Sequence, residues 1–221
     1  DRIAFLGPNG SGKSTLLRFI MGIEEPDDGF AKTGDHNIFP AYFAQNQAEA
    51  LDLNKSVINT MFEAVPDWTQ TEIRSLLGGF SLKNHSVFKS VSQLSGGEKA
   101  RLALALMLVK PCNLLVLDEP TNHLDIPAKQ MLENAIIKYD GAALLVSHDR
   151  YFISRVANKI VEIKDGELIL YKGDYSYFQE KKKEQVAAAE KELILAQAEA
   201  KRLAKRDRHR KRKSPSQNIS N

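Results

Sequence analysis

A lysine, three glycines and three hydroxyl side chains stand together near the start of the chain, in residues 7–15. Glycines let backbone N–H groups turn toward one point without Cβ clashes, and such a nest of donors binds phosphate oxygens. In this spacing Lys13 is expected to reach the β- and γ-phosphates of a nucleotide, and the Ser14 hydroxyl to ligate Mg²⁺. The expected phosphate-binding residues are Gly7, Pro8, Asn9, Gly10, Ser11, Gly12, Lys13, Ser14 and Thr15.

The elements around this loop are those that a phosphate-binding loop needs. Residues 3–6 form a short apolar run, and residues 16–20 have the apolar pattern of a helix. The loop itself fits G-x-x-x-x-G-K-[ST] in full, between a strand and a helix. An ordinary glycine-rich turn is the alternative, but the full match favours a site for a nucleoside triphosphate.

Two carboxylates follow a second apolar strand. The run of residues 114–117 is continuously apolar, which is typical of a strand buried on both faces of a parallel sheet, and it ends in Asp118 and Glu119. Asp118 would hold Mg²⁺ through water at the carboxyl end of the strand. Glu119 is the candidate base that orients the attacking water. The alternative is an acidic strand end without function.

Two further polar residues stand at the ends of predicted strands. His148 closely follows the apolar run of residues 142–146, where it could contact the γ-phosphate. Gln45 follows residues 41–44 and could reach the metal and the attacking water. Their alternatives are a structural histidine and a polar loop residue.

The elements that position these residues alternate between strands and helices, which predicts an α/β fold with a parallel sheet, the fold class of P-loop nucleotide hydrolases. Helical spacing broken by Pro66 and Gly78 predicts several short helices in residues 56–81. The expected strands are 3–6, 30–33, 41–44, 114–118, 142–146, 159–163 and 168–171, and the other expected helices are 16–22, 99–109, 128–139 and 151–156.

The chain divides into a cassette, residues 1–173 with a helical subdomain at about 50–110, and an extension. Residues 180–205 contain no Gly or Pro and are rich in Ala, Glu and Lys, which favours a long helix. Its heptad seam is mostly alanine, so a coiled coil would be weak. We expect a basic helical extension over 174–213 and a disordered tail over 214–221. The expected seam residues are Val186, Ala189, Leu193, Ala196, Ala200 and Leu203.

The composition is that of a globular protein with an appendage: 221 residues, 43% hydrophobic, 27% charged and a net charge of +3. The positive charge is concentrated in residues 201–213, which carry nine basic residues and one acid. No run approaches the roughly 18 apolar residues of a membrane-spanning helix. The single Cys112 fits a reducing compartment. Because the chain begins at Asp1, directly before the first strand, we expect an N-terminally truncated domain.

A further motif adds a resemblance to a known family. Residues 94–98 read Leu-Ser-Gly-Gly-Glu, and this segment resembles the signature of ATP-binding cassette (ABC) ATPases. The order and rough spacing of the phosphate loop, Gln45, the signature, Asp118 and His148 are also similar to those cassettes. Residues 95–105, 118–125, 147–152 and 173–177 resemble the ABC-F branch in particular, whose members are soluble twin-cassette ATPases of the ribosome.

The resemblance implies a mechanism in which two cassettes close head to tail on two ATP molecules. The signature residues Ser95, Gly96, Gly97 and Glu98 would then contact the γ-phosphate of a nucleotide held by another cassette. A hydroxyl and backbone N–H groups at a helix start make such an anion site. Asp125 would lie at the seam between the cassettes.

The resemblance also implies cofactors and partners. ATP and Mg²⁺ are the expected ligands, with Ser14, Gln45 and Asp118 around the metal. We expect the C-terminal cassette of a longer protein, paired with a second cassette of the same full-length chain. The other expected partners are the ribosome, its rRNA and tRNA, with no membrane, in the cytoplasm or in the plastid stroma.

Two rival functions remain open. The first is the cassette of a membrane exporter, whose signature usually reads Ser-Gly-Gly-Gln. The second is a nucleotide-gated binding module that does not hydrolyse ATP. Glu119 and His148 argue against this second rival.

Overall fold

The structure is a computed structural model that describes residues 1–31, 34, 37–44, 47–82, 84–122 and 124–213. The chain divides into two compact units, Asp1–Ser176 and Tyr177–Asn221. The boundary lies three residues beyond the expected one, inside the first turn of the helix that begins at Tyr175.

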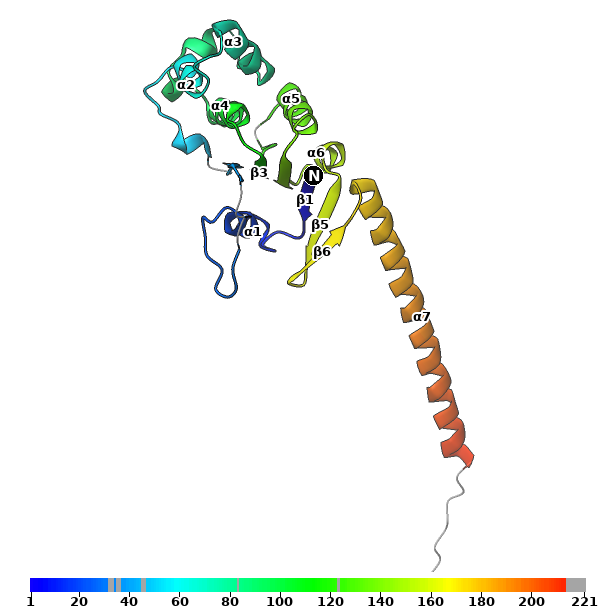
Figure 1. The fold of residues 1–221 in the computed structure, drawn as a ribbon. Helices are drawn as coiled ribbons and strands as arrows, with labels where there is room; N and C mark the ends of the chain where they lie inside the picture. The colour runs from blue at the N-terminus through cyan, green and yellow to red at the C-terminus, as the bar shows by residue number, and fades with distance from the viewer. Residues whose placement is uncertain (32–33, 35–36, 45–46, 83, 123, 214–221) are drawn as a thin grey trace, which may run out of the picture. The chain divides into compact units, whose positions relative to one another are not determined.

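The first unit is built on one six-stranded sheet with the order β2-β3-β4-β1-β5-β6 (Figure 1). Neighbouring strands are parallel except for β5 and β6, which form an antiparallel hairpin at one edge. The predicted strands are confirmed, apart from 30–33: Phe30 and Ala31 are not in a strand, and residues 32–33 lie outside the described part. The strands are β1 (Arg2–Leu6), β2 (Pro40–Phe43), β3 (Leu114–Asp118), β4 (Ala142–Val146), β5 (Lys159–Lys164) and β6 (Glu167–Tyr171).

The second to the sixth α-helix each begin at a side chain that caps the helix, whereas the first α-helix begins after Gly12. Oxygens of Ser56, Thr69, Ser95, Asp125 and Asp149 each accept a hydrogen bond from a backbone N–H in the first helical turn. The helices of the first unit are α1 (Lys13–Ile20), α2 (Val57–Ala64), α3 (Gln70–Gly79), α4 (Gly96–Val109), α5 (Ile126–Ile137) and α6 (Arg150–Val156), with short 3₁₀ helices at Gln47–Ala50, Asn84–Phe88 and Val91–Gln93. Capping by Ser95 starts α4 three residues before the predicted start at residue 99.

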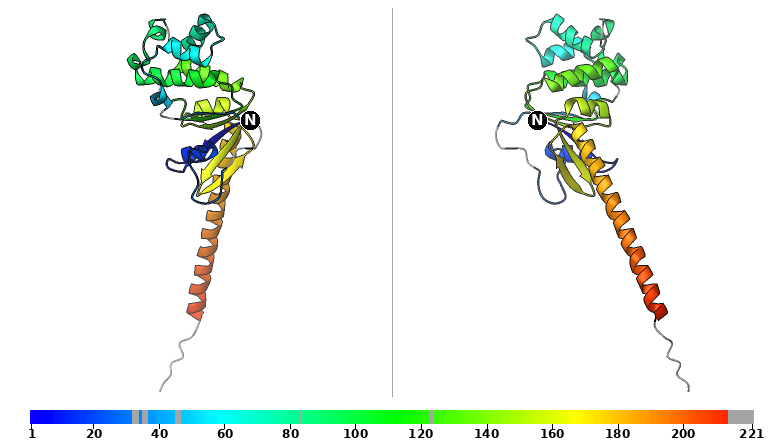
Figure 2. Two further views of the ribbon diagram at one scale, coloured as in Figure 1. Left: turned by 60° about the vertical axis from the view of Figure 1, so that its left-hand side comes forward. Right: turned by 90° about the vertical axis from the view of Figure 1, so that its right-hand side faces the viewer.

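Helices cover both faces of the sheet. Leu17 of α1 packs against Phe5, Val116 and Val146 on one face. The other face carries α5 and α6, as Figure 2 shows, with Leu132 and Phe152 fully buried. The parallel register brings the carboxyl ends of β3 and β4 together, since Asp118 pairs with Val146. Loops that follow these strands therefore meet at one edge of the sheet.

The helical subdomain, α2 to α4, has a core of its own and meets α5 at a glycine. Met61, Ile73, Leu77 and other apolar side chains are fully buried there. A Cβ atom at Gly79 would lie 1.8 Å from Sδ of Met131, so the Met131 side chain packs directly on the backbone of α3 at this glycine. The predicted helical subdomain is confirmed as a set of packed helices.

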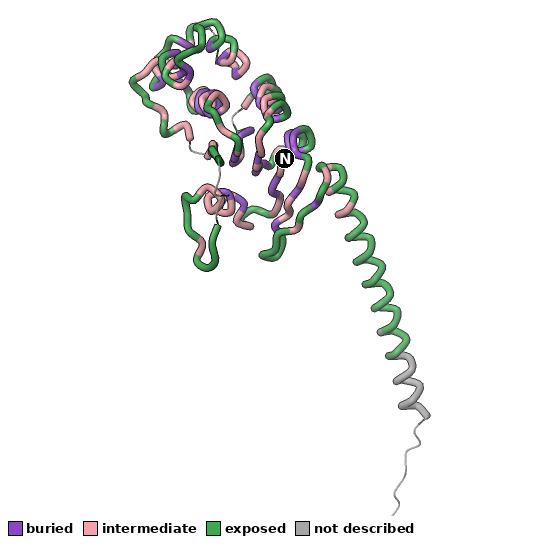
Figure 3. Tube along the Cα trace, viewed as in Figure 1, coloured by how far each residue is buried: buried purple, intermediate pink, exposed green. Residues whose placement is uncertain are grey.

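The second unit consists of the helix α7 (Tyr175–Lys213) from Tyr177 onward, followed by residues outside the described part. All described residues from 183 to 199 are exposed, as Figure 3 shows. The apolar residues Val186, Leu193 and Leu203 are each more than half exposed. Helix formation there depends on local propensity and on i,i+3 or i,i+4 pairs such as Lys181 with Glu184 at 2.7 Å.

Candidate functional site

The loop between β1 and α1 has the backbone of a phosphate-binding nest. Gly10 and Gly12 have φ angles of 78° and 87°, which other residues adopt only at a cost. Gly12 is the N-cap of α1, so the free N–H groups at the start of this helix face the loop. A Cβ atom at Gly7 would lie 2.8 Å from the carbonyl oxygen of Ile163, so the loop runs close against β5.

Lys13 is buried under this loop and holds it closed. Its ammonium group donates hydrogen bonds to the carbonyl oxygens of Gly7 at 3.0 Å and Pro8 at 2.9 Å. The hydroxyl of Ser11 is buried without a hydrogen-bond partner. A buried ammonium, an unpaired hydroxyl and a helix N-terminus in one loop suit an anionic ligand such as a triphosphate.

Ser14 and Asp118 meet at the start of α1. The Ser14 hydroxyl donates a hydrogen bond to Oδ1 of Asp118 at 2.9 Å, across 104 positions of sequence. Both residues line a cavity of about 880 Å³ together with Arg18, Tyr42 and Gln47. One carboxylate and one hydroxyl suit Mg²⁺, which keeps several water ligands. Among the described residues, no cluster of three or more acidic, histidine or cysteine ligands offers another metal site.

Glu119 adopts a backbone conformation that is unusual for its type. Its φ angle is 51°, and its N–H donates to the carbonyl oxygen of Val146 at 2.8 Å. A non-glycine residue in this region stores strain that the surrounding structure must hold. The side chain is 12% exposed, and burial raises the pKa of its carboxyl group, although hydrogen bonding to His148 opposes the shift. A raised pKa is a property of carboxylates that act as bases.

His148 joins Glu119 from the neighbouring strand. The His148 backbone N–H donates to Oε2 of Glu119 at 3.2 Å, and its Nε2 lies 3.5 Å from Oε1. The imidazole is 63% exposed, so it can reach a ligand outside the chain. The structure thus brings together Glu119 and His148, which the sequence placed singly at the ends of two strands.

A network that the sequence did not predict supports these two residues. The buried hydroxyls of Thr121 and Ser147 lie 3.0 Å apart. Nζ of Lys129 donates to Oδ2 of Asp149 at 2.7 Å. Burial alone would raise the pKa of Asp149, but hydrogen bonds from Lys129 and from a backbone N–H outweigh it and lower the pKa. In the sequence, only the repeated polar residues after each strand indicate such a network.

The signature segment is organised by local contacts. Ser95 and Glu98 form a capping box: the Ser95 N–H and hydroxyl donate to Oε2 of Glu98 at 2.9 and 3.0 Å, and the Glu98 N–H donates to Oγ of Ser95. The hydrogen bond from the Ser95 backbone lowers the pKa of Glu98, and burial opposes the shift. Ser95 and Gly96 are exposed, and α4 lies in a different part of the first unit from α1 (Figure 1).

Asp125 and Gln45 are the two remaining predicted site residues. Asp125 caps α5 through a hydrogen bond from the Ala128 N–H at 3.0 Å. Burial alone would raise the pKa of Asp125, but this hydrogen bond and one from the Ser81 side chain lower it. Gln45 lies outside the described residues. Its neighbour Gln47, which the sequence did not single out, lines the cavity at Ser14 and Asp118.

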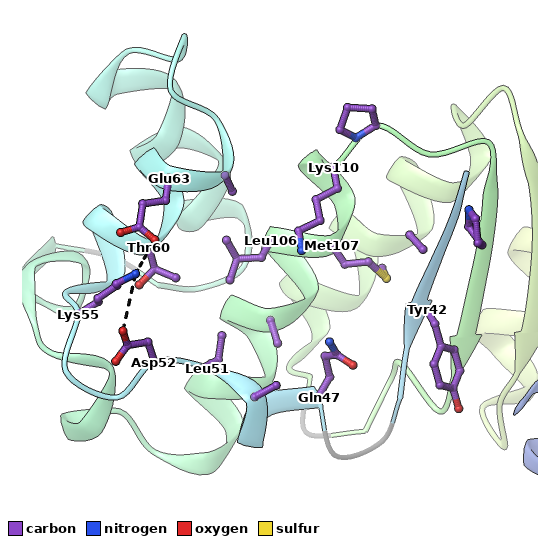
Figure 4. Close-up of a pocket in the computed structure, with 16 residues that line it drawn as sticks. Tyr42, Gln47, Leu51, Asp52, Lys55, Thr60, Glu63, Leu106, Met107 and Lys110 are labelled. Atoms are coloured by element: carbon purple, nitrogen blue, oxygen red, sulfur yellow. Dashed lines mark hydrogen bonds and ion pairs between the residues drawn. The ribbon is translucent and has the colours of Figure 1, made fainter. Parts of the chain in front are cut away.

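A second cavity, of about 650 Å³, lies between β2, α2 and α4 (Figure 4). Leu51, Leu106 and Met107 supply apolar surface. At its rim, Lys55 makes ion pairs with Glu63 at 2.7 Å and Asp52 at 3.7 Å. Tyr42 and Gln47 line both cavities, so these two residues form a wall between the helical subdomain and the Ser14–Asp118 site.

Comparison with known proteins places this geometry in a family. The ABC transporter family matches the chain over residues 1–122. ABC transporter F family member 2 of Arabidopsis thaliana is 56% identical over 181 residues, which cover 82% of this chain and 27% of that protein. The protein YdiF of Bacillus subtilis is 47% identical, over 84% of this chain and 29% of its own length. The chain therefore spans little more than a quarter of these relatives.

The solved structures agree on the fold. A structure of an archaeal ribosome recycling factor, aABCE1, in complex with the ribosomal stalk protein aP1 matches with a TM-score of 0.60 and 28% identity. The match covers 73% of this chain and 31% of that one. The predicted P-loop fold is confirmed. In the described residues, no helix is both long and apolar enough to cross a membrane.

Proposed function

Because this chain belongs to the ABC transporter family, as a cassette of the F type, we propose that it binds ATP with Mg²⁺ and hydrolyses it. The observation that supports this most is the pair of Glu119 and His148 beside the phosphate-binding loop. Glu119 is nearly buried, has a raised pKa and accepts a hydrogen bond from the His148 backbone. A module that only binds nucleotides has no need for a strained, buried carboxylate at this position.

In the proposed mechanism the loop residues hold the phosphates. The N–H groups at residues 10–14 and the ammonium of Lys13 cradle the β- and γ-phosphates. Lys13 exchanges its carbonyl partners, Gly7 and Pro8, for phosphate oxygens. Ser14 and Asp118 would hold Mg²⁺, with Gln45 as the further ligand that the family resemblance implies, and the metal ion would neutralise charge on the phosphates.

Glu119 then acts on the attacking water. Its carboxylate accepts a proton from the water as the oxygen attacks the γ-phosphate in line with the leaving group. Burial keeps the carboxylate more basic than an exposed glutamate. His148, whose imidazole is largely exposed, contacts the γ-phosphate and responds to its loss.

Half of the proposed site is supplied by another cassette. Ser95 and the N–H groups of Gly96 and Gly97 open α4 and form an anion site for the γ-phosphate bound elsewhere. To do so, Ser95 turns its hydroxyl from Glu98 to the phosphate. Asp125 lies at the seam. In the full-length protein the second cassette belongs to the same chain.

We further propose that this cassette acts on ribosomes, in an intracellular compartment. The similar aABCE1 structure is that of a ribosome recycling factor, and the F family relatives are the most similar proteins named above. The basic run at 201–213 would neutralise RNA phosphates without reading bases. If it neutralises about four to six phosphates, affinity for rRNA falls with roughly the third to fifth power of the salt concentration.

A truncation tests this part of the proposal. Ribosome binding of the full-length protein is titrated with KCl, with and without residues 201–221. We expect weaker binding and a smaller salt slope for the truncated form. Equal affinity with an equal slope would show that residues 201–213 do not contact RNA.

A loop variant tests ATP binding and hydrolysis. Lys13→Ala should lose binding of a fluorescent ATP analogue and release of phosphate from ATP. Lys55→Ala is the matched control, because it removes an ammonium group that pairs with Glu63 and Asp52 instead. The assignment of the loop would be contradicted if both variants lost ATP binding and hydrolysis equally, or if neither variant lost them.

A further inference from the structure

The segment that carries His148 is anchored on both sides of this residue. Ser147, on one side, lies 3.0 Å from the buried hydroxyl of Thr121. The backbone N–H of Asp149, on the other side, donates to Oγ of Ser147 at 3.1 Å, and the Asp149 carboxylate accepts a hydrogen bond from Nζ of Lys129 at 2.7 Å. His148 itself has an exposed ring, so the position of its backbone decides where the imidazole lies.

We infer that Lys129 is a positioning residue: its ion pair with Asp149 fixes His148 and, through the His148 N–H, the carboxylate of Glu119. The inference rests on the proposed function and adds a residue that the sequence motifs did not contain. The contacts form one path. Lys129 binds Asp149, Asp149 adjoins His148, and the His148 N–H donates to Oε2 of Glu119 at 3.2 Å.

Asp149 is well suited to transmit the position of Lys129. One carboxylate oxygen, Oδ1, accepts the Phe152 N–H at 3.0 Å and so caps α6, while Oδ2 accepts Lys129. The carboxylate is therefore bonded at both oxygens, and its main chain cannot turn freely. Without Lys129, Oδ2 loses this hydrogen bond, and the turn at residues 147–149 is held by fewer contacts.

Lys129 also links this turn to the start of α5. Asp125 caps α5, and the Lys129 backbone N–H donates to the carbonyl oxygen of Asp125 at 2.9 Å. A movement of Asp125 at the proposed seam would thus carry Lys129 along, because the two residues are one helical turn apart. A displacement of Asp125 by a partner cassette would then change the positions of His148 and Glu119 through Lys129 and Asp149.

The ion pair is too exposed to serve mainly as a stabilising contact. The side chains of Lys129 and Asp149 are 33% and 22% exposed. Pairs in such surroundings contribute little to the free energy of folding. Misplacement of a catalytic group by about 1 Å, by contrast, can reduce a rate by about 10²-fold. A role in geometry is therefore separable from a role in stability.

The test compares Lys129→Met with Lys129→Arg, Asp149→Asn and the double variant of Lys129→Met with Asp149→Asn. Lys55→Met is the control, because Lys55 also makes a 2.7 Å pair with a glutamate but lies at the second cavity. The first readout is the amide NMR signal of His148 and its hydrogen exchange, which report the bond to Glu119 without ATP. The second readout is the rate of single-turnover hydrolysis. The concentration of ATP that gives half of the maximal rate is measured in the same assay.

We expect Lys129→Met to shift the His148 amide signal, speed its exchange and slow single-turnover hydrolysis about tenfold. The half-saturating ATP concentration should stay within about twofold, Lys129→Arg should restore both readouts, and the double variant should lose no more than the stronger single one. An unchanged His148 signal in Lys129→Met, or an equal change in Lys55→Met, would overturn the inference. If the unmodified chain hydrolyses no ATP, the proposed function fails, yet the NMR readout still decides the role of Lys129.

Discussion

The phosphate loop and the signature segment are both helix starts with glycines, yet they are built in opposite ways. The loop is held by distant partners: Ser14 binds Asp118, and Gly7 packs on the backbone of Ile163. The signature is held mainly by itself: Ser95 and Glu98 bond to each other within one helical turn, and the more distant hydrogen bond to this pair is a long one, from the Ser86 hydroxyl to Oε1 of Glu98 at 3.4 Å. The loop is thus part of an assembled site, whereas the signature is a capped helix end whose hydroxyl must change partners to bind a ligand.

This difference indicates which half of a composite site is already assembled within one chain. The loop half has its lysine, the proposed metal-binding pair and the proposed base, Glu119, in place within one chain. The signature half presents exposed Ser95 and Gly96. We therefore expect variants in the loop half to affect chemistry directly, and variants in the signature half to act only on a nucleotide held by another copy.

The largest expected effect is that of Glu119→Gln. The amide keeps the shape of the side chain but cannot accept the proton, so single-turnover hydrolysis should fall by about 10²-fold or more. ATP binding should remain, because the loop is intact. If Glu119→Gln hydrolysed ATP near the rate of the unmodified chain, Glu119 would not be the base.

The pH dependence gives the next largest effect. Burial raises the pKa of Glu119, and a base must be deprotonated, so the rate should fall about tenfold for each pH unit below that pKa. The acid limb should lie above the range of an exposed glutamate. It should be missing from the residual activity of Glu119→Gln. An identical acid limb in both proteins would assign the titration to another group.

Ser95→Ala probes the signature half. Hydrolysis should fall roughly tenfold, less than the 10²- to 10³-fold typical of a lost oxyanion donor, because the N–H groups of Gly96 and Gly97 remain. ATP binding should not change. Removal of the cap also costs about 1 kcal/mol of stability. Thr69→Ala is the matched control, because Thr69 forms the same capping box with Glu72. A similar loss of hydrolysis in both variants would show that Ser95→Ala acts through the lost helix cap and the lower stability, and not through a phosphate contact.

The smallest expected effect is that of Glu98→Gln on stability. The backbone hydrogen bond of Ser95 lowers the pKa of Glu98, so the charged carboxylate stabilises the fold above the unfolded-state pKa. That contribution is lost as pH falls through the lowered folded-state pKa. We expect a loss of about 0.3–1 kcal/mol at neutral pH, and no difference from the unmodified chain in strong acid, both measured by thermal unfolding. A pH-independent difference would point to packing instead.

The sequence predicted the loop half well because its residues follow a fixed spacing. The loop, Asp118 and Glu119 stand where a strand must end, and the structure places them together. The support around them was not predictable. Lys129 and Asp149 are 20 residues apart, and no spacing rule joins a helix to a turn after the next strand. The left-handed backbone of Glu119 was likewise hidden, since the sequence shows a glutamate where a glycine would have signalled it.

The extension illustrates the opposite case. Its helix was predicted from composition alone, because a helix with few packing partners depends on local propensity. The observed α7, Tyr175–Lys213, extends the composition-biased stretch 180–205 at both ends and matches the expected helical extension over 174–213 to within one residue. The tail at 214–221 lies outside the described residues.

A mixing experiment tests most directly the claim that the two halves of the site come from different cassettes, with a second copy of this chain in place of the partner cassette. Lys13→Ala removes the loop half, and Gly97→Asp places a carboxylate at the anion site while favouring the helix start. Each variant alone should hydrolyse ATP near background. Mixed at high concentration, they should be several-fold more active than their sum, because a head-to-tail pair contains one complete site. Activity equal to the sum of the two variants, together with a turnover of the unmodified chain that does not depend on its concentration, would contradict the account.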